Sequence, residues 1–95
     1  MNVVAYQFSS PTCNPCNVIK PAMQDLKEEF PQITWVFVNT QNDSNGYCER
    51  FGVHVVPTMV VAVSDSTGKI IFSEKHSGTA IAGYYRLLRN GLRYL

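Results

Sequence analysis

Apolar residues form a continuous run and then a helical pattern along the first third of this chain. Residues 2–8 form a run rich in β-branched and aromatic side chains, which predicts a buried strand. Over residues 14–30 the apolar positions recur every three or four residues, which predicts an amphipathic helix with charged residues on its outer face. Residues 9–12, which carry Pro11, form the turn between them. The apolar helix positions are Ile19, Met23, Leu26 and Phe30.

Two prolines shape this predicted helix. Pro21 lies in its interior and removes one backbone hydrogen bond, so we expect a kink there. Pro31 follows the last apolar position and marks the end of the helix. The next run, residues 33–38, is almost continuously apolar, which is typical of a central strand covered on both faces.

A polar segment, residues 39–46, separates that run from a short predicted helix. Asp43 or Ser44 is the expected cap at its start, since short oxygen-bearing side chains satisfy the first free N–H groups of a helix. The helix is expected to run through Phe51 and to stop at Gly52, because glycine readily adopts the left-handed conformation that ends helices.

The last part of the chain predicts two strands and a helix. The strands cover residues 59–63 and 69–74, and the turn residues 64–68 join them as an antiparallel hairpin. The loop at residues 77–79 follows, with Thr79 as the candidate helix cap. An apolar stripe then predicts a helix that continues to the C-terminus. The stripe consists of Ile81, Tyr84, Tyr85, Leu88 and Leu92.

The predicted order is therefore β-α-β-α-β-β-α. A strand–helix–strand unit gives a parallel pair and the hairpin adds antiparallel strands, so we expect an α/β fold with a mixed four-stranded sheet flanked by helices. The chain has 95 residues, which is too short for two cores, so residues 1–95 form one domain. Hydrophobic residues make up 45% of the chain, which favours a packed domain over disorder.

Charge and cysteine content narrow the possible functions. The net charge of +1 gives no strong field toward nucleic acid or an anionic membrane, and no apolar run is long enough for a membrane span. The basic residues Arg86, Arg89 and Arg93 are interpreted as a solvated helix face. Met1 leads directly into strand-like sequence, and three cysteines fit a reducing compartment better than a secreted disulfide scaffold. We therefore expect a cytoplasmic protein, with a monomer as the default oligomeric state.

Cys13 and Cys16 are the candidate reactive residues. With only Asn14 and Pro15 between them, their sulfurs can meet in a small ring on the first turn of the helix that follows the first strand. The free N–H groups and positive dipole at a helix N-terminus favour a thiolate over a thiol. Pro15 removes no hydrogen bond in that turn. The pattern indicates a thiol–disulfide site with Cys13 as an exposed nucleophile and Cys16 as a buried, resolving cysteine.

Four landmarks in this order resemble the thioredoxin family over nearly the whole chain. Cys13-Asn14-Pro15-Cys16 resembles the family's Cys-Gly-Pro-Cys site. Pro21 falls where the family kinks its active-site helix. Val56-Pro57-Thr58 resembles the cis-proline segment that faces the two cysteines, and Gly78 falls where the family keeps a glycine beside the substrate groove.

The resemblance implies a thioredoxin-like fold and a thiol–disulfide oxidoreductase that reduces protein disulfides, with roles in electron transport and cell redox homeostasis. Its reductant would be a thioredoxin reductase or small thiols, and it would need no organic cofactor or metal. A cis Val56–Pro57 bond would leave the backbone of Val56 free to pair with an extended substrate. The implied substrate-binding residues are Thr12, Val56, Pro57 and Gly78.

Several positions depart from the family pattern. Thr12 stands where the family usually has Trp, and Asn14 replaces Gly. Gln7 aligns with the buried Asp beneath the second cysteine, and Phe37 with the Lys that accompanies it. Because glutamine cannot take a proton, water or the departing substrate thiolate is expected to accept the proton of Cys16. The opening strand and helix of the family are absent, so a trimmed fold is expected. The residues expected to tune the site are Gln7, Thr12, Asn14, Pro15 and Pro57.

Other interpretations remain open at this stage. Cys13, Cys16, Cys48 and His54 are four potential zinc ligands, although the last two lack the paired spacing of a zinc finger. A glutaredoxin-like enzyme that depends on glutathione suits the short layout, but Ser77-Gly78-Thr79 replaces that family's Gly-Gly pair. The fold could instead serve as a docking module in which the cysteines are secondary. Cys48 is interpreted as a buried small hydrophobe, with a regulatory or dimer-forming thiol as the alternative.

Overall fold

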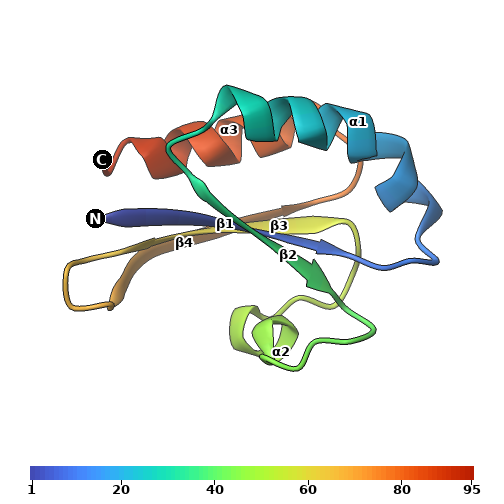
Figure 1. The fold of residues 1–95 in the computed structure, drawn as a ribbon, viewed down its shortest axis with the longest axis horizontal. Helices are drawn as coiled ribbons and strands as arrows, with labels where there is room; N and C mark the ends of the chain where they lie inside the picture. The colour runs from blue at the N-terminus through green and yellow to red at the C-terminus, as the bar shows by residue number, and fades with distance from the viewer.

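The computed structural model describes all residues, 1–95, and contains a single mixed sheet with three helices (Figure 1). The elements follow the predicted order. In chain order they are β1 (Asn2–Ser9), α1 (Asn14–Glu29), β2 (Thr34–Asn39), α2 (Tyr47–Phe51), β3 (Thr58–Ser64), β4 (Ile70–Ser77) and α3 (Ile81–Leu92). None of the three helices has the length and apolar character that crossing a membrane requires.

The four strands lie in the order β2-β1-β3-β4. β1 is parallel to β2 and antiparallel to β3, and β3 pairs with β4 as the predicted hairpin. Helices α1 and α3 lie side by side over one face of the sheet, whereas the short α2 lies below the other face (Figure 1). The predicted fold class, a mixed four-stranded sheet flanked by helices, is confirmed.

The prediction of a central strand at residues 33–38 is wrong. β2 is an edge strand, and the side chain of Phe37 is 64% exposed. The strand covered on both faces is β3, in which every residue from Thr58 to Val63 is buried. An apolar run indicates that a strand has apolar neighbours, but the position of that strand in the sheet depends on which partners pair on either side.

Two hydrophobic clusters hold the layers together. The larger one fills the space between the sheet and helices α1 and α3, and the smaller one lies beneath α2. Side chains of β1 point alternately to the two faces of the sheet, so Val3 and Ala5 pack in the larger cluster and Phe8 packs in the smaller one. From α1 and α3 the larger cluster receives Ile19, Met23, Leu26, Tyr84, Leu87 and Leu88.

Several predicted boundaries shift by a few residues. Helix α1 ends at Glu29 with Phe30 as its C-cap, and β4 continues past residue 74 to Ser77. The cap proposed at Thr79 is wrong, because Ala80 is the N-cap of α3 and no side chain bonds to the free N–H groups there. The predicted stop of α2 at Gly52 is confirmed, since this glycine has φ +66° and caps the helix.

Asp43, which precedes the N-cap residue of α2 in the sequence, caps this helix with its side chain. Its carboxylate accepts hydrogen bonds from the backbone N–H groups of Tyr47 (3.1 Å) and Cys48 (2.8 Å), although Gly46 is the N-cap residue. The bond from Cys48 is the main cause that holds the pKa of the Asp43 carboxyl below its ordinary value. Of the two predicted caps, Asp43 therefore supplies the capping oxygen.

Gly91 allows α3 to approach the sheet closely. A Cβ atom added at this buried position would lie 2.6 Å from Cγ1 of Val61 and 3.2 Å from Cγ1 of Val3. Both neighbours are β-branched side chains in buried strands, which have little room to rotate away.

We predict that Gly91→Ala lowers the free energy of unfolding by about 1 kcal/mol. Overpacking costs about 1–3 kcal/mol, which exceeds the gain of about 1 kcal/mol in helix propensity. Urea unfolding measures the change. The control, Arg86→Ala, lies on the exposed side of α3 and should change stability by no more than about 0.5 kcal/mol. A Gly91→Ala protein as stable as the wild type would contradict the close packing.

Candidate active site

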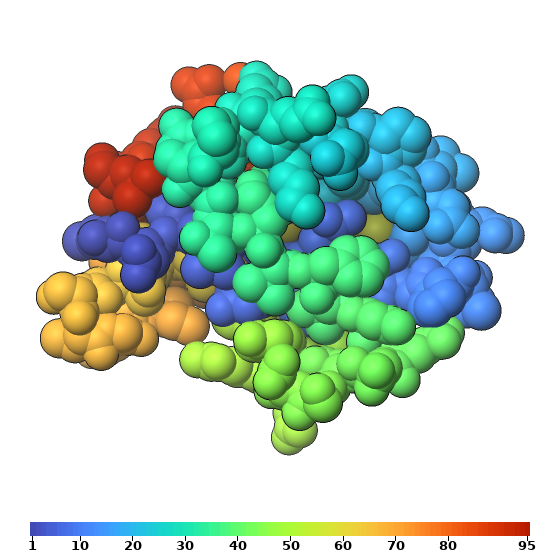
Figure 2. Space-filling model, in the orientation of Figure 1, coloured from blue at the N-terminus to red at the C-terminus, as the bar shows by residue number.

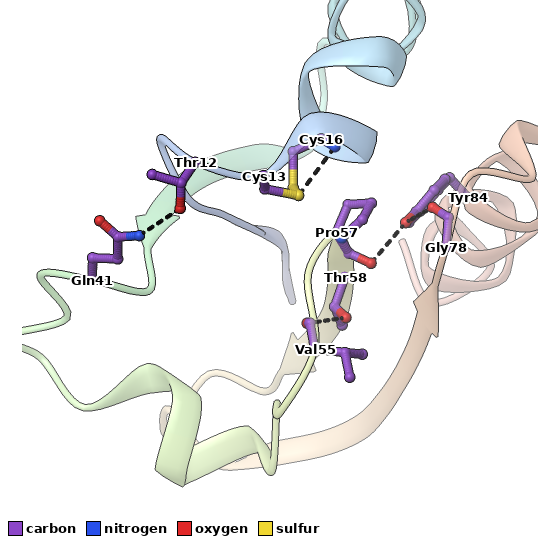
Figure 3. Close-up of a disulfide and its surroundings, with 9 residues drawn as sticks. All are labelled: Thr12, Cys13, Cys16, Gln41, Val55, Pro57, Thr58, Gly78 and Tyr84. Carbon is purple, nitrogen blue, oxygen red and sulfur yellow. Dashed lines mark hydrogen bonds between the residues drawn. A yellow bond between two sulfur atoms is a disulfide. The ribbon is translucent and has the colours of Figure 1, made fainter.

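Cys13 and Cys16 are joined by a disulfide bond at the N-terminus of α1 (Figure 3). Their Cα atoms are 5.2 Å apart, and Cys13 is the N-cap residue of the helix. The backbone N–H of Cys16 donates a hydrogen bond to Sγ of Cys13 at 3.1 Å. The predicted small ring at a helix start is confirmed. The same N–H group is placed to stabilise a thiolate at Cys13 once the disulfide is reduced.

Both cysteines are buried in the disulfide form. Cys16 is 6% exposed, as expected, but Cys13 is only 8% exposed, so the prediction of an exposed Cys13 is wrong for this state. The ring holds the Cys13 sulfur against the first turn of α1, where it faces the Pro57 segment (Figure 3). Reduction would release this ring and leave Cys13 as the sulfur nearer to the turn.

The segment before β3 lies directly opposite the disulfide. The Val56–Pro57 peptide bond is cis, as the resemblance implied. Strand pairing of β3 begins at Thr58, so the backbone of Val56 lies outside the sheet registers. Oγ1 of Thr58 donates a hydrogen bond to the carbonyl oxygen of Val55 (2.7 Å), which closes the turn (Figure 3).

Gly78 is bound to this segment. Its N–H donates a hydrogen bond to the carbonyl oxygen of Pro57 at 3.0 Å, and its φ of +104° lies in the region that favours glycine. The Tyr84 hydroxyl lies 2.6 Å from the carbonyl oxygen of Gly78 and 3.3 Å from that of Pro57 (Figure 3). One hydroxyl of α3 therefore ties both backbone segments that face the disulfide.

The hydrogen-bonding role of Tyr84 was not predicted from the sequence. Its position in the core is confirmed, since the residue is 0% exposed. The available signal was its residue type, because a tyrosine at a fully buried stripe position needs a partner for its hydroxyl. Burial raises the pKa of Tyr84 to about 12, so the hydroxyl stays a neutral donor at ordinary pH.

Thr12 precedes the disulfide and is exposed. Its Oγ1 accepts a hydrogen bond from Nε2 of Gln41 at 2.9 Å, which connects the turn after β1 to the loop after β2 (Figure 3). Asn14 and Pro15 are also exposed on the first turn of α1. These three residues form the outer rim of the site, next to Cys13.

A polar cavity of about 360 Å³ lies behind Cys16, between α1 and the edge formed by β1 and β2. Figure 2 shows the dark blue atoms of β1 in a hollow between the cyan of α1 and the green of β2. Gln7, on β1, and Cys16 both line this cavity, so the relation between them that the resemblance implied is present. The other lining residues are Ser9, Ser10, Pro11, Asn17, Lys20, Met23, Gln24, Lys27, Phe37 and Asn39.

The four residues considered as zinc ligands are not brought together. Cys48 lies on α2, below the sheet face opposite α1, and His54 is exposed (Figure 1). No group of three or more His, Cys, Asp or Glu side chains gathers closely enough to hold a metal ion. Cys48 is half-buried rather than buried, and its burial, together with Asp43, raises the pKa of its thiol.

Comparison with known proteins gives a consistent family and fold. The profile of the family described as Thioredoxin matches residues 2–84. The M-type chloroplastic thioredoxin of Zea mays is 32% identical over 59 residues, which cover 61% of this chain and 35% of that protein. The chain spans only 35% to 44% of the length of the first curated relatives that it matches.

Two solved structures illustrate the common fold. Fasciola hepatica thioredoxin superposes with a TM-score of 0.78 at 21% identity, covering 95% of this chain and 81% of the other. A second similar chain comes from a complex of ferredoxin:thioredoxin reductase with thioredoxin f2, with a TM-score of 0.77 at 19% identity, covering 94% of this chain and 76% of the other. At these identities the likeness shows the fold alone.

We predict that Tyr84→Phe lowers the free energy of unfolding by about 1–3 kcal/mol, because it leaves the carbonyl of Gly78 without its hydroxyl donor and removes the second donor to the carbonyl of Pro57. Urea unfolding at neutral pH measures this loss. A variant with wild-type stability would contradict the bridging role of the hydroxyl.

The same variant should change the response to high pH. The pKa of Tyr84 is raised to about 12 in the folded protein, against about 10 for an exposed tyrosine. The contribution of Tyr84 to the free energy of unfolding is therefore complete below pH 10 and is lost as the pH rises from 10 to 12. Stability measured over this range should fall less steeply in Tyr84→Phe than in the wild type. Tyr94→Phe, at an exposed position, is the matched control.

Proposed function

The chain belongs to the thioredoxin family, and we propose that it is a thiol–disulfide oxidoreductase that reduces disulfide bonds in other proteins. The observation that carries the proposal is the Cys13–Cys16 disulfide at the N-terminus of α1, opposite the cis-Pro57 segment. Two neighbouring thiols that can form and break a disulfide with each other can exchange electrons with a second disulfide without an organic cofactor.

In the first step, the Cys13 thiolate attacks one sulfur of a substrate disulfide. The new bond joins Cys13 to that sulfur, the substrate disulfide breaks, and the other substrate sulfur leaves as a thiolate that takes a proton from water. The N–H of Cys16 and the N-terminus of α1 support the negative charge on Cys13 before the attack.

In the second step, the Cys16 thiolate attacks the sulfur of Cys13. The Cys13–Cys16 disulfide forms, the mixed disulfide breaks, and the second substrate sulfur leaves as a thiolate that also takes a proton from water. The substrate has gained two electrons and two protons, and the protein has been oxidised. Cys16 must first lose its proton, and neighbouring Gln7 cannot accept it.

The rim of the site suits an extended peptide. The backbone of Val56, outside the strand pairing, is available to bond with a substrate backbone as in strand addition. Thr12 lies on the other side of the disulfide, and Gly78 lies beside Pro57, where its lack of a side chain leaves space. We assign substrate binding to Thr12, Val56, Pro57 and Gly78, and tuning of the cysteines to Asn14 and Pro15.

The partners and setting belong to the same proposal. Its reductant is a thioredoxin reductase or a small thiol; the solved complex of ferredoxin:thioredoxin reductase with thioredoxin f2 supports a reductase for a protein of this fold. In this role the protein carries electrons and contributes to cell redox homeostasis. We propose a cytoplasmic location because three cysteines fit a reducing compartment, although the relatives include chloroplastic and mitochondrial proteins, and we take a monomer as the default oligomeric state.

We predict that Cys13→Ser abolishes the reduction of insulin disulfides by the protein in the presence of dithiothreitol, because it removes the attacking sulfur. Cys16→Ser should also lose turnover and, after it has been reduced and freed of dithiothreitol, should accumulate a mixed disulfide between Cys13 and the substrate, visible in the intact mass. Cys48→Ser, the control, should retain wild-type activity. Full biological activity of the Cys13→Ser, Cys16→Ser double variant would contradict the enzyme and favour a docking module.

We predict that Gln7→Asp accelerates the second step at pH 7 by at least about tenfold, because a positioned general base typically contributes about 10²–10⁴-fold. The rate at which the mixed disulfide resolves, followed by stopped flow, measures the effect. Gln7→Asn is the matched control, since it shortens the side chain equally without adding a carboxylate. An unchanged rate in Gln7→Asp would mean that a missing carboxylate does not limit this enzyme.

A further inference from the structure

The cavity behind Cys16 has an unusual charge balance. Among its lining residues, Lys20 and Lys27 are the only charged side chains, and none carries a carboxylate. The remaining polar side chains are neutral amides and hydroxyls, contributed by Gln7, Ser9, Ser10, Asn17, Gln24 and Asn39. The surroundings of the resolving thiol are therefore positive and contain no base.

The other elements packed around Cys16 add no opposing charge. The smaller space on the inner side of Cys16 is lined by Gln7, Pro57, Thr58 and Tyr84 among others, and none of its lining residues is acidic. With a pKa of about 12, the Tyr84 hydroxyl is neutral. Among the residues that line these two spaces, the charged ones are therefore Lys20 and Lys27, both on α1.

Lys20 is the nearer of the two. It lies four residues after Cys16 on α1, and residues with this spacing are neighbours on one helix face, with Cβ atoms about 5–6 Å apart. Lys27 is eleven residues from Cys16, or about 16 Å along the helix axis, beyond the screening distance of about 10 Å at 0.1 M salt. Both side chains are exposed to solvent and line the cavity, so their ammonium groups can move along its wall.

We propose that Lys20 is a positioning residue for the second step, whose ammonium group favours the Cys16 thiolate at the wall of the cavity in place of a carboxylate base. This inference rests on the proposed function. The proton of Cys16 passes to water in the cavity, and the resulting thiolate attacks Cys13 and expels the substrate thiolate. No residue of the protein holds the proton, so the rate of this step follows the fraction of Cys16 present as thiolate.

A neutral dipyridyl disulfide tests the proposal. In a Cys48→Ser background, which removes the third thiol, the reduced protein releases one absorbing pyridinethione when Cys13 attacks and a second when Cys16 resolves the mixed disulfide. Because the probe carries no negative charge, a lysine cannot act by attracting it. Stopped-flow absorbance gives the rates of both phases, and Cys16→Ser, which lacks the second, identifies them.

We predict that Lys20→Met moves the pH profile of the second phase upward by about half a pH unit. This shift corresponds to a roughly threefold slower second phase below the midpoint, with the rate at high pH unchanged. Lys20→Arg should restore the wild-type profile. Lys27→Met should shift the profile less, Lys69→Met on the β3–β4 turn should not shift it, and 1 M salt should reduce the shift in Lys20→Met.

The outcomes separate this proposal from the proposed function. If Lys20→Met and the wild type have the same profile, or if the rate falls equally at every pH, Lys20 does not act through the charge on Cys16 and the inference is wrong. If the wild type releases no pyridinethione in either phase, the oxidoreductase function itself fails.

Discussion

The antiparallel pairing of β1 with β3 is the constraint on which the site depends. Its register places Phe8, near the end of β1, opposite Thr58, at the start of β3. The chain leaves β1 toward Cys13 and enters β3 from Pro57. Cys13 and Pro57 therefore lie at the same end of the sheet, although they are far apart in the sequence. A slip of one residue would turn buried side chains outward, so burial of the strands fixes the meeting of disulfide and proline.

α3 adds the second constraint, because the Tyr84 hydroxyl joins two segments that the sheet does not hold. Pro57 precedes β3 and Gly78 follows β4, and the Tyr84 hydroxyl lies close to the carbonyl of each. Close packing of α3 at Gly91 and the core position of Leu88 fix the helix that carries this hydroxyl. The surface opposite the disulfide is thus bonded to a packed helix, which suits a site that must hold a peptide near one sulfur.

The sequence predicted those features that are local or periodic. The strand at residues 2–8 followed from its β-branched and aromatic content, and the helix at residues 14–30 followed from the spacing of its apolar residues. The cysteine pair followed from its own spacing. The edge position of β2 did not, because strand order depends on pairings that the apolar run does not contain. The same holds for the Tyr84 bonds, which cross from α3 to two distant loops, and for the cavity, whose walls come from α1, β1 and β2. The cap at Thr79 failed because short polar residues near a predicted start do not fix where the helix begins.

The departures from the family pattern at Gln7 and Phe37 both concern the free-energy cost of burying a charge. A carboxylate at the half-buried position 7 would lose part of its hydration beside Cys16, and a buried charge is expensive unless a partner compensates it. Gln7 avoids that cost, and the exposed Phe37 on the edge strand no longer needs to supply a compensating cation. The positive charge instead comes from α1, where Lys20 keeps its contact with solvent and loses little hydration. The combination of a neutral strand face and a cationic helix flank therefore avoids the desolvation cost of a buried charge on folding. The resolving thiol still faces a positive charge when its proton leaves.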